Sequence, residues 1–230
     1  MNILFVGNSY TYFNDLPQLF QDLARANGKQ LNTFSVTKGG RRLDAYMDPS
    51  DETTHQLERL IRERHYDVCF LQEQSTLPAL DYTAFLSGVQ HVLQMAKGCA
   101  DKFCLYATWG RKAGSPDLET HGWTPESMTD LLAKSYQKAG QHFGATVSHV
   151  GQCFWHIKSR HPHIELHNPD LTHPSYQGSC LAALMHYQTL FGNFPENTQV
   201  LGLQPEVLEA FRSAVRAVSE SSQHRIDGET

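Results

Sequence analysis

A serine near the start of this 230-residue chain and an aspartate–histidine pair near its end have the types and spacing that nucleophilic chemistry needs. Ser9 follows a short apolar run, residues 2–6, with only Gly7 and Asn8 between them. A serine hydroxyl is inert at neutral pH unless a base removes its proton during attack. The sequence therefore has to supply a base that reaches Ser9 from elsewhere in the chain.

The best candidate for that base is His173, three residues after Asp170 in a turn-rich segment just before a predicted helix. At this spacing the carboxylate can accept a hydrogen bond from one imidazole nitrogen, which fixes the ring tautomer and leaves the other nitrogen free for Ser9. Taken singly, Ser9 is typical of a turn or cap, and D-x-x-H is typical of a cap followed by a surface histidine. Their combination in one chain favours a Ser-His-Asp triad.

The elements that must position these residues alternate between strands and helices. Apolar runs rich in β-formers predict strands, and amphipathic stretches with capping residues predict helices. The predicted strands are residues 2–6, 30–36, 68–71, 102–108 and 146–150. The predicted helices are residues 16–27, 54–64, 82–97, 125–143, 175–191 and 205–218.

This alternation, with nearly continuous apolar strands, predicts an α/β fold with a parallel sheet of about five strands covered on both faces. We expect a single domain over residues 1–218 and a polar, frayed tail over residues 219–230. Ligands of open α/β sheets bind beyond the carboxyl ends of the strands, which here are followed by residues 7–14, 72–78 and 109–124. The segments 109–124 and 155–172 are predicted to be irregular, and loops of that length are usually functional.

Composition narrows the possible partners. A net charge of −5 without a basic stripe argues against nucleic acid, and no apolar run is long enough to cross a membrane. Five cysteines without a C-x-x-C pair indicate reduced thiols. Because the first strand begins almost at Met1, there is no room for a signal peptide, and we expect a cytoplasmic protein. The oligomeric state stays open.

Two blocks of the sequence resemble those of the SGNH, or GDSL-type, hydrolase superfamily. Gly7-Asn8-Ser9 resembles its G-[DN]-S block, and D-L-T-H-P at residues 170–174 resembles its D-x-x-H block followed by proline. A bacterial branch with G-N-S-[FY]-T and L-Q-E-Q-S is more similar still. The resemblance implies a three-layer α/β/α sandwich, flavodoxin-like in its order, with no cofactor. It also implies that Ser9 is the nucleophile, His173 the general base and Asp170 the acid that orients it.

The resemblance further implies an oxyanion hole made by the backbone N–H groups of Ser9 and of a glycine after the second strand, for which Gly40 is the choice. The family's G-x-N-D block, whose asparagine donates a third hydrogen bond, is replaced here by Leu71-Gln72-Glu73-Gln74. A glutamine amide can donate the same bond. Gln72 is the first choice and Gln74 the second, and alternation puts both on the same side of an extended segment.

Other side chains near the strand ends have two interpretations each. Tyr10, Tyr12 and Phe13 follow the serine and could form an aromatic wall for a sugar ring or pack under the loop. Arg111 could contact an acidic or sugar group or lie on the surface, while Trp109 could line the pocket or belong to the core. Arg41-Arg42 could attract an anionic substrate or only be solvated.

A second kind of chemistry is suggested by His161, His163 and His167, whose H-x-H-x3-H spacing could hold a metal. No carboxylate or cysteine completes a familiar site, so a solvated histidine-rich loop is the preferred interpretation and we expect no metal.

These observations favour a serine esterase that hydrolyses a small-molecule ester with a short acyl group. An acetylated carbohydrate is the leading substrate, an expectation that rests on analogy with the family. Three alternatives stay open: an acyltransferase with the same triad, a catalytically silent binding module, and a metal-dependent hydrolase using the histidine loop. The replaced asparagine is the one feature that points to the silent module.

Overall fold

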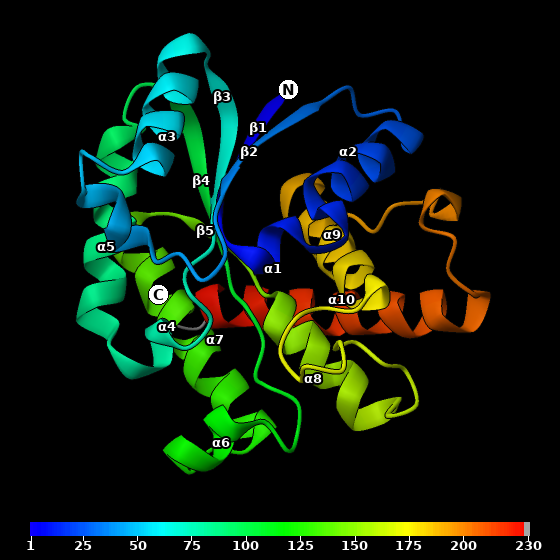
Figure 1. The fold of residues 1–230 in the computed structure, drawn as a ribbon. Helices are drawn as coiled ribbons and strands as arrows, with labels where there is room; N and C mark the ends of the chain where they lie inside the picture. Colours follow the sequence, from blue (N-terminus) through cyan, green and yellow to red (C-terminus); the bar gives the residue numbers. More distant parts are fainter. Residues whose placement is uncertain (228–230) are drawn as a thin grey trace.

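The computed structural model describes residues 1–227 and is built on a five-stranded sheet (Figure 1). The strands are β1 (Asn2–Gly7), β2 (Asn32–Thr37), β3 (Tyr66–Leu71), β4 (Ala100–Tyr106) and β5 (Thr146–Ser148). Their order is β2-β1-β3-β4-β5, and every neighbouring pair is parallel. This is the flavodoxin-like order, so the predicted parallel sheet and its topology are confirmed.

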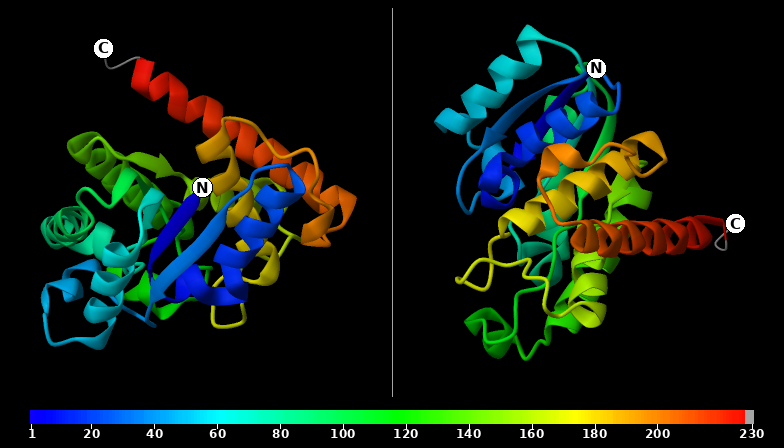
Figure 2. Two further views of the ribbon diagram at one scale, coloured as in Figure 1. Left: turned by 90° about the horizontal axis from the view of Figure 1, so that it is seen from above. Right: turned by 90° about the vertical axis from the view of Figure 1, so that its right-hand side faces the viewer.

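Helices cover both faces of the sheet (Figures 1 and 2). One face packs against α2 (Leu16–Ala26), α8 (Val150–Arg160), α9 (Tyr176–Phe191) and α10 (Pro205–Asp227). The other packs against α3 (Glu52–Glu63), α5 (Tyr82–Met95) and α7 (Pro125–Phe143). The shorter helices are α1 (Ser9–Tyr12), η1 (Phe13–Asp15), η2 (Leu43–Met47), α4 (Leu77–Leu80), α6 (Pro116–His121) and η3 (Gln199–Leu201). The predicted three-layer α/β/α sandwich is confirmed.

The alternation of side chains along each strand explains the two cores. In β1, Ile3 and Phe5 belong to the core under α2 and α9, while Leu4 and Val6 belong to the core under α3 and α5. Successive strand side chains point to opposite faces, so a strand covered on both sides must be apolar at every position. Because of that requirement, the strands appear in the sequence as continuous apolar runs and could be predicted from it.

The strand order separates two chain segments at one point of the sheet edge. From β1 the chain turns to β2 on one side, whereas β3 pairs with β1 on its other side, with Val6 opposite Leu71. The segments that leave β1 and β3 therefore diverge at the carboxyl edge, which is where ligands of such sheets bind. Asn8 and then Ser9 follow the end of β1, and Gln72 follows the end of β3.

The structure corrects the predicted secondary structure at α8. The sequence placed a strand over residues 146–150 and an irregular segment over 155–172, but β5 ends at Ser148 and α8 begins at Val150. The N-cap residue, His149, makes no side-chain capping hydrogen bond, so the usual sequence signal for a helix start is missing. Within the predicted irregular segment 109–124, Pro116 begins the six-residue helix α6.

The C-terminal boundary also differs. The predicted frayed tail, residues 219–230, is helical as far as Asp227, and residues 228–230 lie outside the described residues. The hydroxyl groups of Ser219 and Ser222 donate to the carbonyl oxygens of Val215 and Val218, one helical turn earlier. Serine hydroxyls in this arrangement find their hydrogen-bond acceptors within the helix itself. The polar composition of this segment therefore did not end the helix.

The packing of α8 against the end of β4 leaves no room for a side chain at Gly151. A Cβ atom there would lie 2.0 Å from the carbonyl oxygen of Thr108. We expect Gly151→Ala to lower the free energy of unfolding by at least about 2 kcal/mol, because the contact is with backbone that cannot move aside. Gly192→Ala is the control: it has open space around the new Cβ but a φ of +76°, and should cost about 1 kcal/mol. Thermal or urea unfolding compares the two, and equal losses would contradict this account.

Candidate active site

Ser9 is the first residue of α1, and Asn8 before it caps that helix. The Asn8 side-chain oxygen accepts from Tyr10 N–H at 3.2 Å, its amide nitrogen donates to the Arg41 carbonyl at 3.0 Å, and its backbone N–H donates to Gln72 Oε1 at 2.9 Å. Asn8 is thus held from three directions, which fixes the turn that presents Ser9. The Ser9 N–H lies in the first turn of a helix, where no intrahelical acceptor exists.

The structure brings Ser9, His173 and Asp170 together from the two ends of the chain. His173 Nε2 lies 2.8 Å from Ser9 Oγ, and His173 Nδ1 lies 2.7 Å from Asp170 Oδ2. The other carboxylate oxygen, Asp170 Oδ1, accepts the backbone N–H groups of Thr172 and His173, each at 2.9 Å. One oxygen therefore shapes the turn and the other orients the ring.

These contacts also set the protonation pattern. A carboxylate can only accept, so Nδ1 of His173 carries the proton and Nε2 offers its lone pair to the Ser9 hydroxyl. Burial favours the neutral acid at Asp170, but the hydrogen bonds from His173 and Thr172 outweigh it and lower the pKa of Asp170. An ionised Asp170 at neutral pH is what a triad requires of its acid.

The segment that follows β4 holds the turn carrying Asp170 and His173. Trp109 Nε1 donates to the Thr172 carbonyl at 3.1 Å, and the Lys112 N–H donates to the Leu171 carbonyl at 3.0 Å. Leu171 has a φ of 65°, a left-handed conformation that is costly for a branched side chain. Such backbone persists only where the surroundings enforce it, and it concentrates at functional sites.

The predicted oxyanion glycine lies in the loop after β2. Gly40 is exposed and has a φ of +67°, which glycine adopts without strain. The bond from Asn8 to the Arg41 carbonyl holds this loop against the turn that presents Ser9. A Cβ on the neighbouring Gly39 would lie 3.2 Å from the Tyr12 hydroxyl, so α1 and the loop are in close contact.

The two candidate glutamines have different surroundings. Gln72 is buried, its Oε1 accepts from Asn8 N–H and Thr11 Oγ1, and its amide nitrogen donates to the Glu73 carbonyl. A Cβ at Gly7 would lie 2.7 Å from that same Oε1, which explains why glycine stands before Asn8. Gln72 therefore joins the ends of β1 and β3.

Gln74 is partly exposed, and hydrogen bonds to its side-chain oxygen fix the orientation of its amide group. Its Oε1 accepts the backbone N–H groups of Thr76 and Leu77, each at 3.0 Å, so the amide nitrogen must face the other way. That nitrogen has a single long contact within the described residues, 3.5 Å to Ser75 Oγ. Its N–H groups are therefore available to a ligand.

Two residues predicted to bind substrate are too deeply buried to touch one in this structure. Trp109 has no exposed surface and Tyr10 is 2% exposed. Their rings stack with centroids 4.4 Å apart, and Trp109 stacks in turn on Phe154 at 4.1 Å. The Tyr10 ring meets His173 edge-on at 5.7 Å. This aromatic layer packs against the His173 ring through Tyr10. Trp109 belongs to the core, which is one of its two interpretations from the sequence.

Arg111 is also buried and engaged. Its guanidinium donates to the Tyr10 hydroxyl, to Ser75 Oγ at 2.9 Å and to Asp117 Oδ2 at 2.8 Å. Each of these contacts uses a different nitrogen, and 7% of the residue is exposed. Neither the substrate contact nor the surface position predicted for Arg111 fits; it ties the Tyr10 ring to the segments after β3 and β4.

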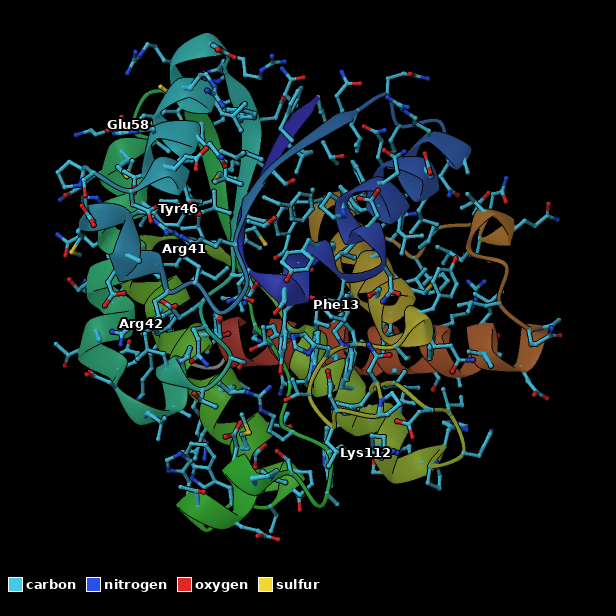
Figure 3. The ribbon with its side chains drawn as sticks, viewed as in Figure 1. Phe13, Arg41, Arg42, Tyr46, Glu58 and Lys112 are labelled. Atoms are coloured by element: carbon cyan, nitrogen blue, oxygen red, sulfur yellow. The ribbon has the colours of Figure 1, made fainter. Side chains whose placement is uncertain are left out.

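The two arginines beside Gly40 are engaged within the protein as well (Figure 3). Arg41 is buried, pairs with Asp51 at 2.9 Å and lies over the Tyr46 ring at 4.3 Å. Arg42 pairs with Asp44 at the surface.

Two neighbours of the site make contacts that the sequence did not predict. Phe13 stacks on the His173 ring with centroids 4.3 Å apart and planes 9° from parallel. Glu73 is fully buried and accepts the N–H groups of Leu43 at 3.0 Å and of Gln74 at 2.6 Å. Burial raises the pKa of Glu73 to about 8. Glu73 thus joins the segment after β2 to the segment after β3.

The histidine loop does not form a ligand cluster. His167 is buried and donates from Nε2 to the Gly110 carbonyl at 3.2 Å, so it serves the packing of this loop. Across residues 1–227, no group of three histidine, cysteine or acidic side chains is placed to hold a metal ion. In the same part of the chain, none of the helices is both long and apolar enough to cross a membrane.

Neither a protein-family model nor a curated protein matches this sequence. Solved structures do. A protein from Slackia heliotrinireducens described as an SGNH hydrolase is 28% identical, with a TM-score of 0.73 over 83% of this chain and 98% of that one. A DUF4886 family protein from Bacteroides uniformis is 15% identical, with a TM-score of 0.79 over 94% of this chain and 93% of that one.

A catalytic mutant of an acetylxylan esterase from Geobacillus stearothermophilus is 10% identical, with a TM-score of 0.59 over 83% of this chain and 94% of that one. The chain has the fold of the SGNH/GDSL hydrolase superfamily. The similarity to the 28% identical Slackia heliotrinireducens protein supports a hydrolase.

The buried Glu73 predicts how stability depends on pH. Its pKa is about 8 in the folded protein against an ordinary value of 4.5, so between these values the folded state keeps a proton that the unfolded chain has lost. The free energy of unfolding should therefore fall as the pH rises toward 8, by up to about 1.4 kcal/mol per pH unit. Burial lowers the pKa of His167 to about 4 and of His186 to about 3, so their effect is confined to pH below about 6.5.

Urea unfolding between pH 6.5 and 8 isolates Glu73. Glu73→Gln should flatten the decline, because a neutral amide still accepts the Leu43 and Gln74 N–H groups and has no proton to lose. Glu119→Gln, at an exposed position, is the control and should leave the slope unchanged. A wild-type stability that does not change over this range would contradict a raised pKa at Glu73.

Proposed function

We propose that the protein is a serine esterase that hydrolyses short acyl esters through an acyl-enzyme. The observation that carries the proposal is the continuous hydrogen-bonded chain from Ser9 Oγ through His173 to Asp170, with links of 2.8 and 2.7 Å. Each member has the partner that its role requires: a base for the hydroxyl and an ionised acid for the base. The similarity to SGNH hydrolases supports the same reaction class.

In this mechanism Ser9 Oγ attacks the ester carbonyl while His173 Nε2 takes its proton. The carbonyl oxygen becomes an anion in the tetrahedral intermediate. His173 then gives the proton to the departing alcohol, and a water molecule activated by the same nitrogen releases the acyl group. Asp170 stays ionised throughout and stabilises the transient imidazolium.

The oxyanion is held by donors on three segments that meet at the sheet edge. We assign the Ser9 and Gly40 N–H groups, following the sequence prediction, and the Gln74 amide. Gln74 is preferred to Gln72 because its oxygen is fixed by backbone donors and its nitrogen makes one long contact, 3.5 Å to Ser75 Oγ. Both ends of the Gln72 amide are engaged inside the protein. Donors fixed before the reaction stabilise the intermediate without having to reorganise.

The proposed substrate is an acetyl or similarly short ester of a carbohydrate. The structural similarity to an acetylxylan esterase supports the class, as does an exposed aromatic ring beside the nucleophile. Tyr12 is 44% exposed and lies next to Gly39 on one side and Phe13 on the other. Aromatic faces of this kind can carry a sugar ring.

The same triad could also transfer the acyl group to another alcohol. Product analysis with an added acceptor alcohol separates hydrolysis from acyl transfer.

Covalent labelling tests the nucleophile. A fluorophosphonate should form one adduct, located on Ser9 by peptide mapping, and none in Ser9→Ala. Hydrolysis of p-nitrophenyl acetate should fall by about 10³-fold or more in kcat for Ser9→Ala and for His173→Ala, because the members of a triad act as a unit. His163→Ala, on the exposed histidine loop, should retain both properties. A folded wild-type protein that neither labels nor hydrolyses the ester would favour a silent binding module.

A Gln→Glu change separates the two glutamines, because it conserves the size of the side chain but replaces the amide donor with a carboxylate, which only accepts. Gln74→Glu keeps the acceptor for Thr76 and Leu77 but removes the donor, so kcat should fall by about 10²-fold or more with thermal stability retained. Gln72→Glu buries a carboxylate between the ends of β1 and β3, so its main effect should be lost stability. Full activity in Gln74→Glu would move the third donor elsewhere.

A further inference from the structure

We propose that Phe13 is a positioning residue for His173, and that its ring stabilises the imidazolium formed during acylation and deacylation. This inference rests on the proposed function, in which His173 is the general base. Nothing in the motif blocks points to Phe13, because it lies four residues after Ser9 and outside the G-N-S segment. The assignment comes from geometry alone.

The imidazole of His173 contacts two aromatic rings. Phe13 covers one face in a nearly parallel stack, with centroids 4.3 Å apart, and the Tyr10 ring makes an edge contact with centroids 5.7 Å apart. The two nitrogens lie in the imidazole plane and reach Asp170 and Ser9. Phe13 lies beside α1 (Figure 3). With both its plane and its edge fixed, the ring keeps Nε2 aimed at the hydroxyl.

The turn that carries Phe13 is bound to the segment that carries His173. Asn14 and Asp15 have φ values of 54° and 51°, a left-handed conformation that asparagine and aspartate tolerate better than most residues. Asn14 Nδ2 donates to the Pro174 carbonyl at 3.2 Å and to Ser179 Oγ at 2.9 Å, and Ser179 Oγ lies 3.3 Å from the Phe13 carbonyl. The stack is therefore built into the fold and is not an accidental contact.

The face of an aromatic ring attracts cations. Neutral imidazole gains little from it, whereas the imidazolium that forms as Ser9 attacks gains a cation–π contact. An interaction made only after proton transfer lowers the barrier without tightening the binding of substrate. Phe13 would thus contribute to kcat and not to KM.

Other groups also act on the charge of His173 and have to be kept constant. Asp170, on its own segment, favours the imidazolium directly. Arg111, from the segment after β4, donates to the Tyr10 hydroxyl, and its positive charge disfavours the imidazolium. Asp15 is exposed in the same turn as Phe13, and Lys112 is paired with Glu165. A substitution at Phe13 leaves all of these in place.

The test is the pKa of His173 measured by NMR in the wild type and in Phe13→Leu. The chain has 13 histidines, so the His173 signal is assigned as the one missing in His173→Ala. Leucine keeps the apolar cover but has no π face, so the His173 pKa should fall by about 0.3–0.7 unit. Phe13→Tyr restores an aromatic face and should titrate like the wild type. Phe191→Leu, which removes an aromatic ring from the end of α9, should leave the signal unchanged.

Kinetics gives a second signature. In Phe13→Leu, the acidic limb of the pH profile of kcat/KM for p-nitrophenyl acetate should move to lower pH, because a weaker base is deprotonated earlier. The plateau should nonetheless fall by about 2–5-fold, in kcat rather than KM. A change that only loosened the fold would lower the plateau without moving the limb to lower pH.

The outcomes separate this inference from the proposed function. An unchanged His173 pKa in folded Phe13→Leu would overturn the inference, and so would a lowered pKa with an unchanged plateau. If the pKa falls but the wild type hydrolyses no ester, the stack is real and the proposed function fails. Should Phe13→Leu not fold, Asn14→Gly serves instead: it keeps the left-handed turn, removes the bonds to Pro174 and Ser179, and should give a smaller shift in the same direction.

Discussion

The hydrogen bond from the Asn8 N–H to the Gln72 side-chain oxygen joins the ends of two neighbouring strands, and the candidate site is built outward from it. Gly7 must lack a side chain for Gln72 to approach, and Asn8 must be held for α1 to begin at Ser9. The same asparagine reaches the loop after β2 through the Arg41 carbonyl. A parallel sheet brings these strand ends to one edge, and this small buried network turns that edge into a site with fixed geometry.

A second set of contacts brings the base to that edge. The turn of Asp170 and His173 comes from beyond the sheet, and the segment after β4 holds it through Trp109 and Lys112. The aromatic layer of Tyr10 and Trp109 lies underneath. The left-handed Leu171 shows that this turn takes its conformation from its surroundings and not from its own preferences. Both halves of the proposed triad thus depend on tertiary contacts that neither segment makes alone.

The sequence predicted the parallel sheet, and the approach of Ser9, His173 and Asp170 to one another, because both leave local patterns: apolar runs in the strands, G-N-S at Ser9 and D-x-x-H at His173. It ranked Gln72 above Gln74, and we prefer the reverse order, because only the structure shows that both ends of the Gln72 amide are engaged inside the protein. It predicted Tyr10, Trp109 and Arg111 as substrate-binding residues, but it could not show that all three side chains are buried. The helix α8 lacked a capping signal, and Phe13 has no motif around it.

The distance along the chain between the proposed nucleophile and its base has a consequence for biosynthesis. Ser9 and His173 are 164 residues apart, and the contacts of Asn14 with Pro174 and Ser179 span 160 and 165. Chains are made from the N-terminus onward, and contacts between distant segments close late in folding. The serine therefore emerges from the ribosome long before the histidine that would activate it. A nascent chain that stops before His173 would carry the hydroxyl without its base, so reactivity is gained only after residues 170–179 have been made and have folded against the N-terminal segment.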